Sequence, residues 1–97
     1  MNSESQMRIL EIIYNYYGVE GKEFNNLLKN REKRFLILLL LKNNSFFNNE
    51  DLINVLGISS TNQVKYMFRK AEEKFLINSF FRKEYMKLEE KIKKQIN

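Results

Sequence analysis

The sequence of 97 residues contains no cysteine and no histidine. Without cysteine the chain can form neither a disulfide nor a thiolate metal site. Without histidine it lacks the usual metal ligand and the side chain best suited to proton transfer near neutral pH. Twelve carboxylates remain, but no nucleophile–base pair, ligand cluster or glycine-rich phosphate loop accompanies them. We therefore expect a protein that is not an enzyme and has no catalytic residues, no metal and no cofactor.

Proline is also absent, and there are only three glycines, Gly18, Gly21 and Gly57. So few turn signals favour a small number of long helices over a sheet of many short strands. The length corresponds to one domain, which we predict over residues 1–97. We predict the all-α fold class, as a compact bundle of about five to six helices around a central buried helix.

Targeting and membrane signals are missing as well. The first ten residues contain no basic stretch followed by an apolar one, as a secretory signal would. The apolar run Phe35–Leu41 has seven residues, whereas a bilayer span needs about 20. We therefore expect a cytoplasmic protein.

The same apolar run predicts the centre of the fold. Seven consecutive apolar residues defeat an amphipathic pattern, and periodicity alone would also allow a buried strand. The preceding segment Arg31–Arg34 is charged and favours a helix, so we predict a helix that is buried on most sides. Lys33 and Arg34 would then lie at its solvated end.

Positive charge is concentrated in the C-terminal part of the chain. Residues 1–59 carry seven basic and seven acidic side chains, whereas residues 60–97 carry ten basic and five acidic ones, which accounts for the net charge of +5. A local surplus of this kind attracts polyanions, chiefly nucleic acid or an anionic membrane. The alternative is that the lysines only keep a helix in solution.

A helix-turn-helix is predicted at about residues 49–76. A short helix carrying Leu52 and Leu56 ends at Gly57, and a second helix with apolar residues at helical spacing follows. Asn and Gln side chains at the start of such a helix can pair with adenine, and Ser and Thr can contact phosphates or bases. Five consecutive side chains of these kinds stand there: Ser59, Ser60, Thr61, Asn62 and Gln63.

The solvated side of this second helix adds cations to the polar groups. We predict that Asn62, Gln63 and Tyr66 contact bases, because they lie toward the start of the helix on its solvated side. The residues predicted to hold phosphates are Lys65, Arg69, Lys70 and Arg34, with Lys33 beside them. An ordinary amphipathic helix with a basic solvated face is the alternative.

A last helix is predicted at about residues 79–95. Its apolar residues recur at helical spacing and its outer side is rich in lysine. The apolar face is only about three turns long, which favours packing on the domain over a coiled coil or a membrane surface. We expect no membrane partner, but Phe80, Phe81 and Tyr85 could anchor a second copy or another protein.

The order of these segments resembles a known DNA-binding domain. Residues 13–19 (IYNYYGV), the REKR segment with its long apolar helix, Leu56-Gly57 and residues 64–74 (VKYMFRKAEEK) together resemble the C-terminal domain, domain IV, of the bacterial replication initiator DnaA. The resemblance covers roughly residues 8–76 and implies an all-helical domain of the Trp-repressor-like group. It implies that Arg69 and Lys70 contact phosphate, and it matches Arg34 to an arginine at the start of the long helix.

Two departures separate the chain from that domain. Ser60-Thr61-Asn62-Gln63 stands where members that read the origin box carry Asp-His-Thr-Thr, and Asn25–Asn30 replaces a longer, arginine-rich loop. Both argue against the standard origin sequence and minor-groove contact. We thus expect a DNA-binding domain that acts on duplex DNA in replication or transcription regulation, and the alternative is a protein-interaction module of the same fold that no longer reads DNA.

Overall fold

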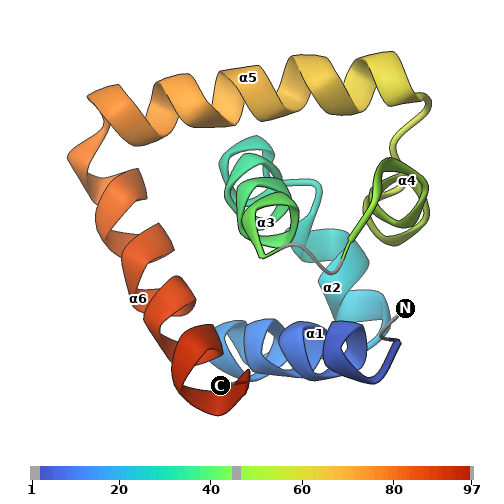
Figure 1. Cartoon of the computed structure of the whole chain (residues 1–97), viewed down its shortest axis with the longest axis vertical. Helices are drawn as coiled ribbons and strands as arrows, with labels where there is room; N and C mark the ends of the chain where they lie inside the picture. Colours follow the sequence, from blue (N-terminus) through green and yellow to red (C-terminus); the bar gives the residue numbers. More distant parts are fainter. Residues whose placement is uncertain (1–2, 45–46, 97) are drawn as a thin grey trace.

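The computed structural model describes residues 3–44 and 47–96, and these residues form six helices and no strand. The all-α fold class is therefore confirmed. The helices are α1 (Ser3–Tyr17), α2 (Lys22–Leu27), α3 (Arg31–Asn43), α4 (Asn49–Leu56), α5 (Thr61–Ile77) and α6 (Ser79–Ile96). Figure 1 shows α1, α5 and α6 arranged around α3, with α4 on the remaining side.

Helix α3 is the centre of the molecule, as its apolar run predicts. The side chain of Asn30 accepts a hydrogen bond from the Lys33 amide at 3.0 Å and so caps the first turn. All seven residues from Phe35 to Leu41 are buried. They can be apolar on every side because α1, α4, α5 and α6 surround them.

Helix α6 packs its apolar side against α1, α3 and α5. Phe81, Tyr85, Leu88 and Ile92 are buried, which confirms the predicted apolar face of the last helix. Arg82 Nη1 donates to the carbonyl oxygens of Phe75 at 2.7 Å and Leu76 at 3.2 Å. These bonds satisfy carbonyls at the end of α5 and hold the sharp corner between α5 and α6.

No helix within residues 3–44 and 47–96 combines the length and the apolar content needed to cross a bilayer. The core is continuous and contains no buried charged residue among those described.

Candidate nucleic-acid interface

The segment between α4 and α5 is a tight turn with defined ends. Gly57 ends α4 in the left-handed conformation, with φ 63° and ψ 40°, which a residue without a Cβ adopts at little cost. The amide of Ile58 donates to the carbonyl of Ile53 at 3.1 Å, and the Ile58 side chain is buried. The Ser60 hydroxyl then accepts from the Gln63 amide at 3.2 Å and caps α5.

Arg34 braces this turn from α3. Its Nη2 lies 3.4 Å from the carbonyl oxygen of Leu56 and 3.3 Å from that of Gly57. Its Nε is buried and has no hydrogen-bond partner among the described residues. The guanidinium therefore points at the C-terminal end of α4, where a cation is favourable for the helix dipole, and not straight into solvent.

Lys33 lies apart from the other predicted site residues. Its ammonium donates to both carboxylate oxygens of Glu84 on α6, at 2.7 and 2.8 Å, and lies 5.3 Å from the centre of the Tyr17 ring on α1. Lys33, which is predicted to hold a phosphate, is therefore already paired within the protein. Lys33 instead joins α3 to α1 and α6.

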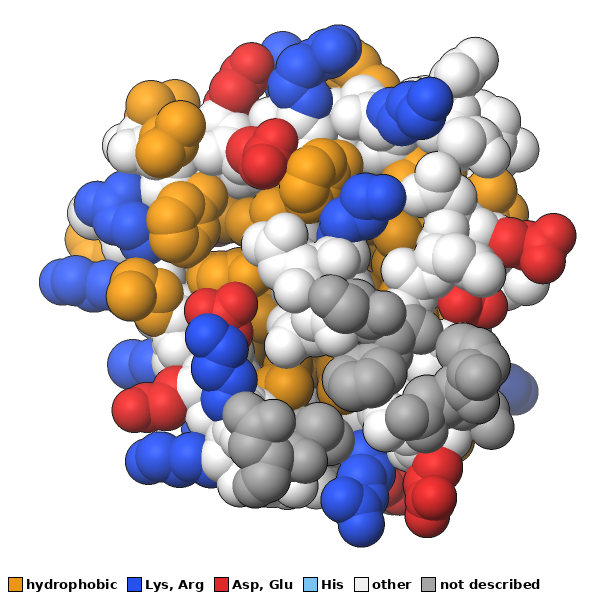
Figure 2. All heavy atoms as spheres, in the orientation of Figure 1, with side chains coloured by type: hydrophobic (Ala, Val, Ile, Leu, Met, Phe, Trp, Pro, Cys, Tyr) orange, Lys and Arg blue, Asp and Glu red, His pale blue; other side chains and the backbone are white. Residues whose placement is uncertain are grey.

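The first turn and the outer side of α5 project away from the body of the protein. Val64, Met67 and Ala71 are buried on the opposite side of the helix, so its orientation is fixed by packing. Figure 2 shows Lys and Arg side chains projecting from the edge that α5 forms. The exposed predicted residues are Ser59, Ser60, Thr61, Asn62, Gln63, Lys65, Tyr66 and Arg69.

Two of the cations on this side have no partner within the protein. Lys65 and Arg69 make no hydrogen bond or ion pair with any described residue. Lys70 is half-buried; its ammonium lies 5.7 Å from the centre of the Tyr66 ring and 3.9 Å from Glu73. An exposed ion pair of this length contributes little, so Lys70 can exchange it for a phosphate.

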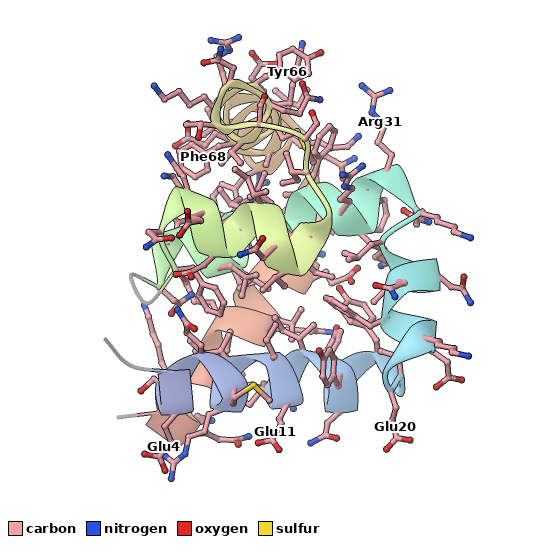
Figure 3. All side chains as sticks on the ribbon, turned by 90° about the vertical axis from the view of Figure 1, so that its right-hand side faces the viewer. Glu4, Glu11, Glu20, Arg31, Tyr66 and Phe68 are labelled. Atoms are coloured by element: carbon pink, nitrogen blue, oxygen red, sulfur yellow. The ribbon has the colours of Figure 1, made fainter. Side chains whose placement is uncertain are left out.

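Arg31, at the start of α3, lies beside this surface. Figure 3 shows Arg31 rising from α3 toward the level of Tyr66, with a gap between the two side chains. Arg31 and Tyr66 both line two adjoining hollows, of about 390 and 370 Å³, along the side of α5. The first hollow is lined by the cations Lys70 and Lys74 and by the carboxylates Glu32 and Glu73, and Lys29 and Gln63 line the second. Cations from two separate elements thus flank the polar start of α5.

Lys29 and Arg31 are not among the residues predicted from the sequence. In the sequence, Lys29 belongs to the nearly uncharged stretch Asn25–Asn30, and Arg31 begins the charged segment that precedes the buried helix. One feature of the sequence could have indicated the exposure of Arg31. It precedes the first buried residue of α3, Phe35, by a full turn, so its side chain lies at the exposed start of the helix. Its guanidinium lies 5.4 Å from the centre of the Phe35 ring.

The corner between α5 and α6 carries a second surface feature. Leu76, Ile77 and Phe80 are 74%, 83% and 83% exposed. Phe81 and Tyr85, predicted as anchors for a partner, are 2% and 3% exposed and therefore belong to the core. Of the three predicted anchors, only Phe80 is available to another molecule.

No group of three or more acidic side chains among the described residues is arranged to hold a metal ion. The chain matches no family model, no curated protein and no solved structure in the comparisons with known proteins.

Proposed function

We propose that this chain binds duplex DNA, with α4, the turn at Gly57 and α5 acting as a helix-turn-helix. The observation that carries the proposal is the outer side of α5, where Asn62, Lys65 and Arg69 are exposed and unpaired among the described residues. The first turn of α5 would enter the major groove. There Asn62 and Gln63 would meet base edges, and Tyr66 would lie against the groove wall.

Phosphate contacts would come from both sides of this groove-binding helix. Lys65, Arg69 and Lys70 belong to α5, and Lys29 and Arg31 reach the same surface from the α2–α3 side. Five phosphate contacts predict a slope of about −4.5 for log K against log salt. Arg34 acts indirectly in this proposal, because it holds the turn that sets the direction of α5.

The kinship to domain IV of DnaA is part of the same proposal. It is supported by the buried helix α3, by the left-handed Gly57 before α5 and by the position of Arg69 and Lys70 on the outer half of α5. In that case the protein acts on DNA in replication or transcription regulation.

The test measures binding to a labelled duplex of random sequence. Fluorescence anisotropy gives the affinity at each of several salt concentrations. The variant Lys65→Ala/Arg69→Ala should weaken binding and reduce the slope by about 1.8. The control variant Arg8→Ala/Lys91→Ala loses the same charge from the exposed surface of α1 and α6 and should keep the slope. Absence of binding at about 50 mM salt and micromolar protein would contradict the proposal, since non-specific affinity alone is measurable there.

A protein-interaction module of the same fold is the second candidate, and the exposed corner of Leu76, Ile77 and Phe80 favours it. The variant Arg69→Ala/Lys70→Ala separates the two candidates. It weakens DNA binding if α5 is the DNA-binding helix and leaves a protein partner's affinity unchanged if the corner is the only functional surface. Selection of bound duplexes from a random pool would then identify the target sequence.

A further inference from the structure

The corner between α5 and α6 brings together large apolar side chains that the fold leaves in solvent. Among the described residues six large hydrophobic side chains are exposed, and three of them, Leu76, Ile77 and Phe80, lie within five residues of one another. Arg82 fixes this corner by its bonds to the Phe75 and Leu76 carbonyls. Large apolar side chains that are exposed close together on a small domain are a feature of interaction surfaces.

Charges of opposite sign flank the patch on its two helices. On α5, Glu72 and Glu73 lie one turn before Leu76 and Ile77. On α6, Lys83 and Lys87 lie about one and two turns after Phe80 on the same side of the helix. Glu72, Lys83 and Lys87 make no ion pair with any described residue, and Glu73 has only the long, exposed pair with Lys70, at 3.9 Å.

We infer that this corner is the contact surface for a second copy of the chain, related by a two-fold axis. A two-fold contact places the same patch opposite itself, so an apolar centre with an acidic flank and a basic flank is complementary to its own copy. The acidic flank of each protomer then faces the basic flank of the other, while Leu76, Ile77 and Phe80 bury one another. A surface of one charge sign would instead fit a polyanion or a polycation.

The spacing of two α5 helices in such a dimer suits the proposed DNA binding. Only this argument from spacing rests on the proposed function. α5 has 17 residues and is about 25 Å long. Two α5 helices that meet near their C-terminal ends would place their first turns about 35 Å apart if the angle between the helices is about 90°. Successive major grooves on one side of a duplex are about 34–36 Å apart. In such a dimer the first turns of the two α5 helices would enter successive major grooves of one duplex.

The experiment is sedimentation equilibrium of the full chain, without DNA, from low micromolar to several hundred micromolar protein. We expect the weight-average mass to rise from 11.8 kDa toward twice that value. Phe80→Ser should remain at 11.8 kDa at all concentrations. Met7→Ser removes a side chain that is 55% exposed on α1 and should behave as the wild type. Circular dichroism verifies that both variants are folded.

Charge reversal tests the orientation of the two copies. Glu72→Lys/Glu73→Lys and Lys83→Glu/Lys87→Glu should each be monomeric alone, because like charges then meet across the axis. An equimolar mixture of the two variants should dimerise, because both contacts are restored with exchanged signs.

A mass that stays at 11.8 kDa for the wild type overturns the inference and leaves the corner to a different occupant, such as another protein or a lipid surface. A mixture that fails to dimerise, or a Phe80→Ser variant that self-associates as the wild type does, also overturns it.

Because no DNA is present, failure of the dimer and failure of DNA binding are separate results. A monomer that binds duplex with the expected salt dependence removes only this inference. A dimer that does not bind duplex removes the proposed function and leaves the surface assignment in place.

Discussion

Lys33 and Arg34 are neighbours in the sequence, yet their side chains serve different parts of the molecule. Lys33 pairs with Glu84, whose carboxylate also accepts a hydrogen bond from the Tyr17 hydroxyl. One carboxylate on α6 thus joins α1 and α3. Arg34 is directed to the carbonyls at the end of α4. At the residue scale, the partly buried cations Lys33 and Arg34 bond within the protein. The exposed cations Lys65 and Arg69 have no partner among the described residues and remain available to a ligand.

Replacement of Arg34 tests its structural role. Arg34→Ala should lower the free energy of unfolding by about 1–2 kcal/mol, because two carbonyls at the end of α4 lose a charged donor. Because the Arg34 guanidinium is bonded to the turn, we expect the slope of log K against log salt to remain that of the wild type. Urea unfolding and anisotropy titrations measure the two effects. A stable variant whose slope falls by about 0.9 would show that Arg34 contacts phosphate directly.

Tyr85 makes the stability depend on pH in the alkaline range. Burial raises the pKa of Tyr85 to about 12, against an ordinary value of 10.0, and the neighbouring Glu89 carboxylate adds to the effect. The folded state therefore favours the neutral phenol, so the unfolding free energy is unaffected below pH 10 and falls as the pH rises from 10 to about 12. The full loss from this group is about 2–3 kcal/mol.

The measurement compares wild type with Tyr85→Phe by urea unfolding at pH 8 and pH 11. At pH 8 the variant should be less stable, because Asn43 and Glu89 lose their hydrogen bonds to the hydroxyl, which are both 2.9 Å long. At pH 11 this difference should shrink, because the variant has no phenol to ionise. Equal differences at the two pH values would show that Tyr85 does not titrate on unfolding in this range. Tyr66→Phe, on the surface of α5, serves as the control.

At the scale of the elements, α5 has two sides with different roles. One side is packed on α3 and α4, which sets the direction of the helix. The other side is polar and cationic along its first three turns. The start of α3 extends this surface through Arg31, so the candidate interface consists of one whole helix side and the end of a second helix.

Arg31 provides a test of that composite surface. Arg31→Ala should weaken binding to any duplex and reduce the salt slope by about 0.9, since one phosphate contact is lost. Lys22→Ala removes an exposed cation at the start of α2 and should leave affinity and slope unchanged. Anisotropy titrations at several salt concentrations distinguish the two variants. If both lower the affinity equally, the protein's overall charge attracts DNA and no composite surface exists.

At the scale of the whole molecule, the fold is a layer of helices wrapped around α3. The molecule measures 29 × 28 × 25 Å along its principal axes, and α4, α5 and α6 each pack directly on the central helix. This arrangement places α3 at the centre of a core to which the surrounding helices also contribute buried side chains. It also leaves side chains on the outer sides of α5 and α6 exposed, among them Lys65, Arg69, Lys83 and Lys87.

The same substitution, leucine to alanine, at a buried and at an exposed position compares the contribution of the two sites to the free energy of unfolding. Leu38→Ala, at a position that is 0% exposed in α3, should lower the free energy of unfolding by about 2–5 kcal/mol, because it opens a cavity at the centre. Leu76→Ala, at a position that is 74% exposed, should change it by less than about 0.5 kcal/mol at low protein concentration. Urea denaturation followed by circular dichroism gives both values. Similar effects at the two positions would contradict a core centred on α3.

Local patterns in the chain are sufficient to predict several features of this protein. The helical fold class, the burial of Phe35–Leu41 and the extent of the last two helices follow from the scarcity of turn residues and from apolar spacing. The exposure of Asn62 and Arg69 follows from the same spacing, because burying Val64 and Ala71 turns the opposite side of α5 outward. These features depend on residues within a turn or two of one another.

Other features depend on how the helices meet. Nothing near Lys33 in the chain indicates that Glu84, 51 residues later, neutralises it, or that Arg34 caps a helix that begins 15 residues after it. The approach of Arg31 to Tyr66 and the exposure of Phe80 next to the buried Phe81 have the same origin. These features result from the crossings of α3 with α4, α5 and α6 and from the crossing of α5 with α6. The angle of a helix crossing is set by side chains from distant parts of the chain that pack against each other.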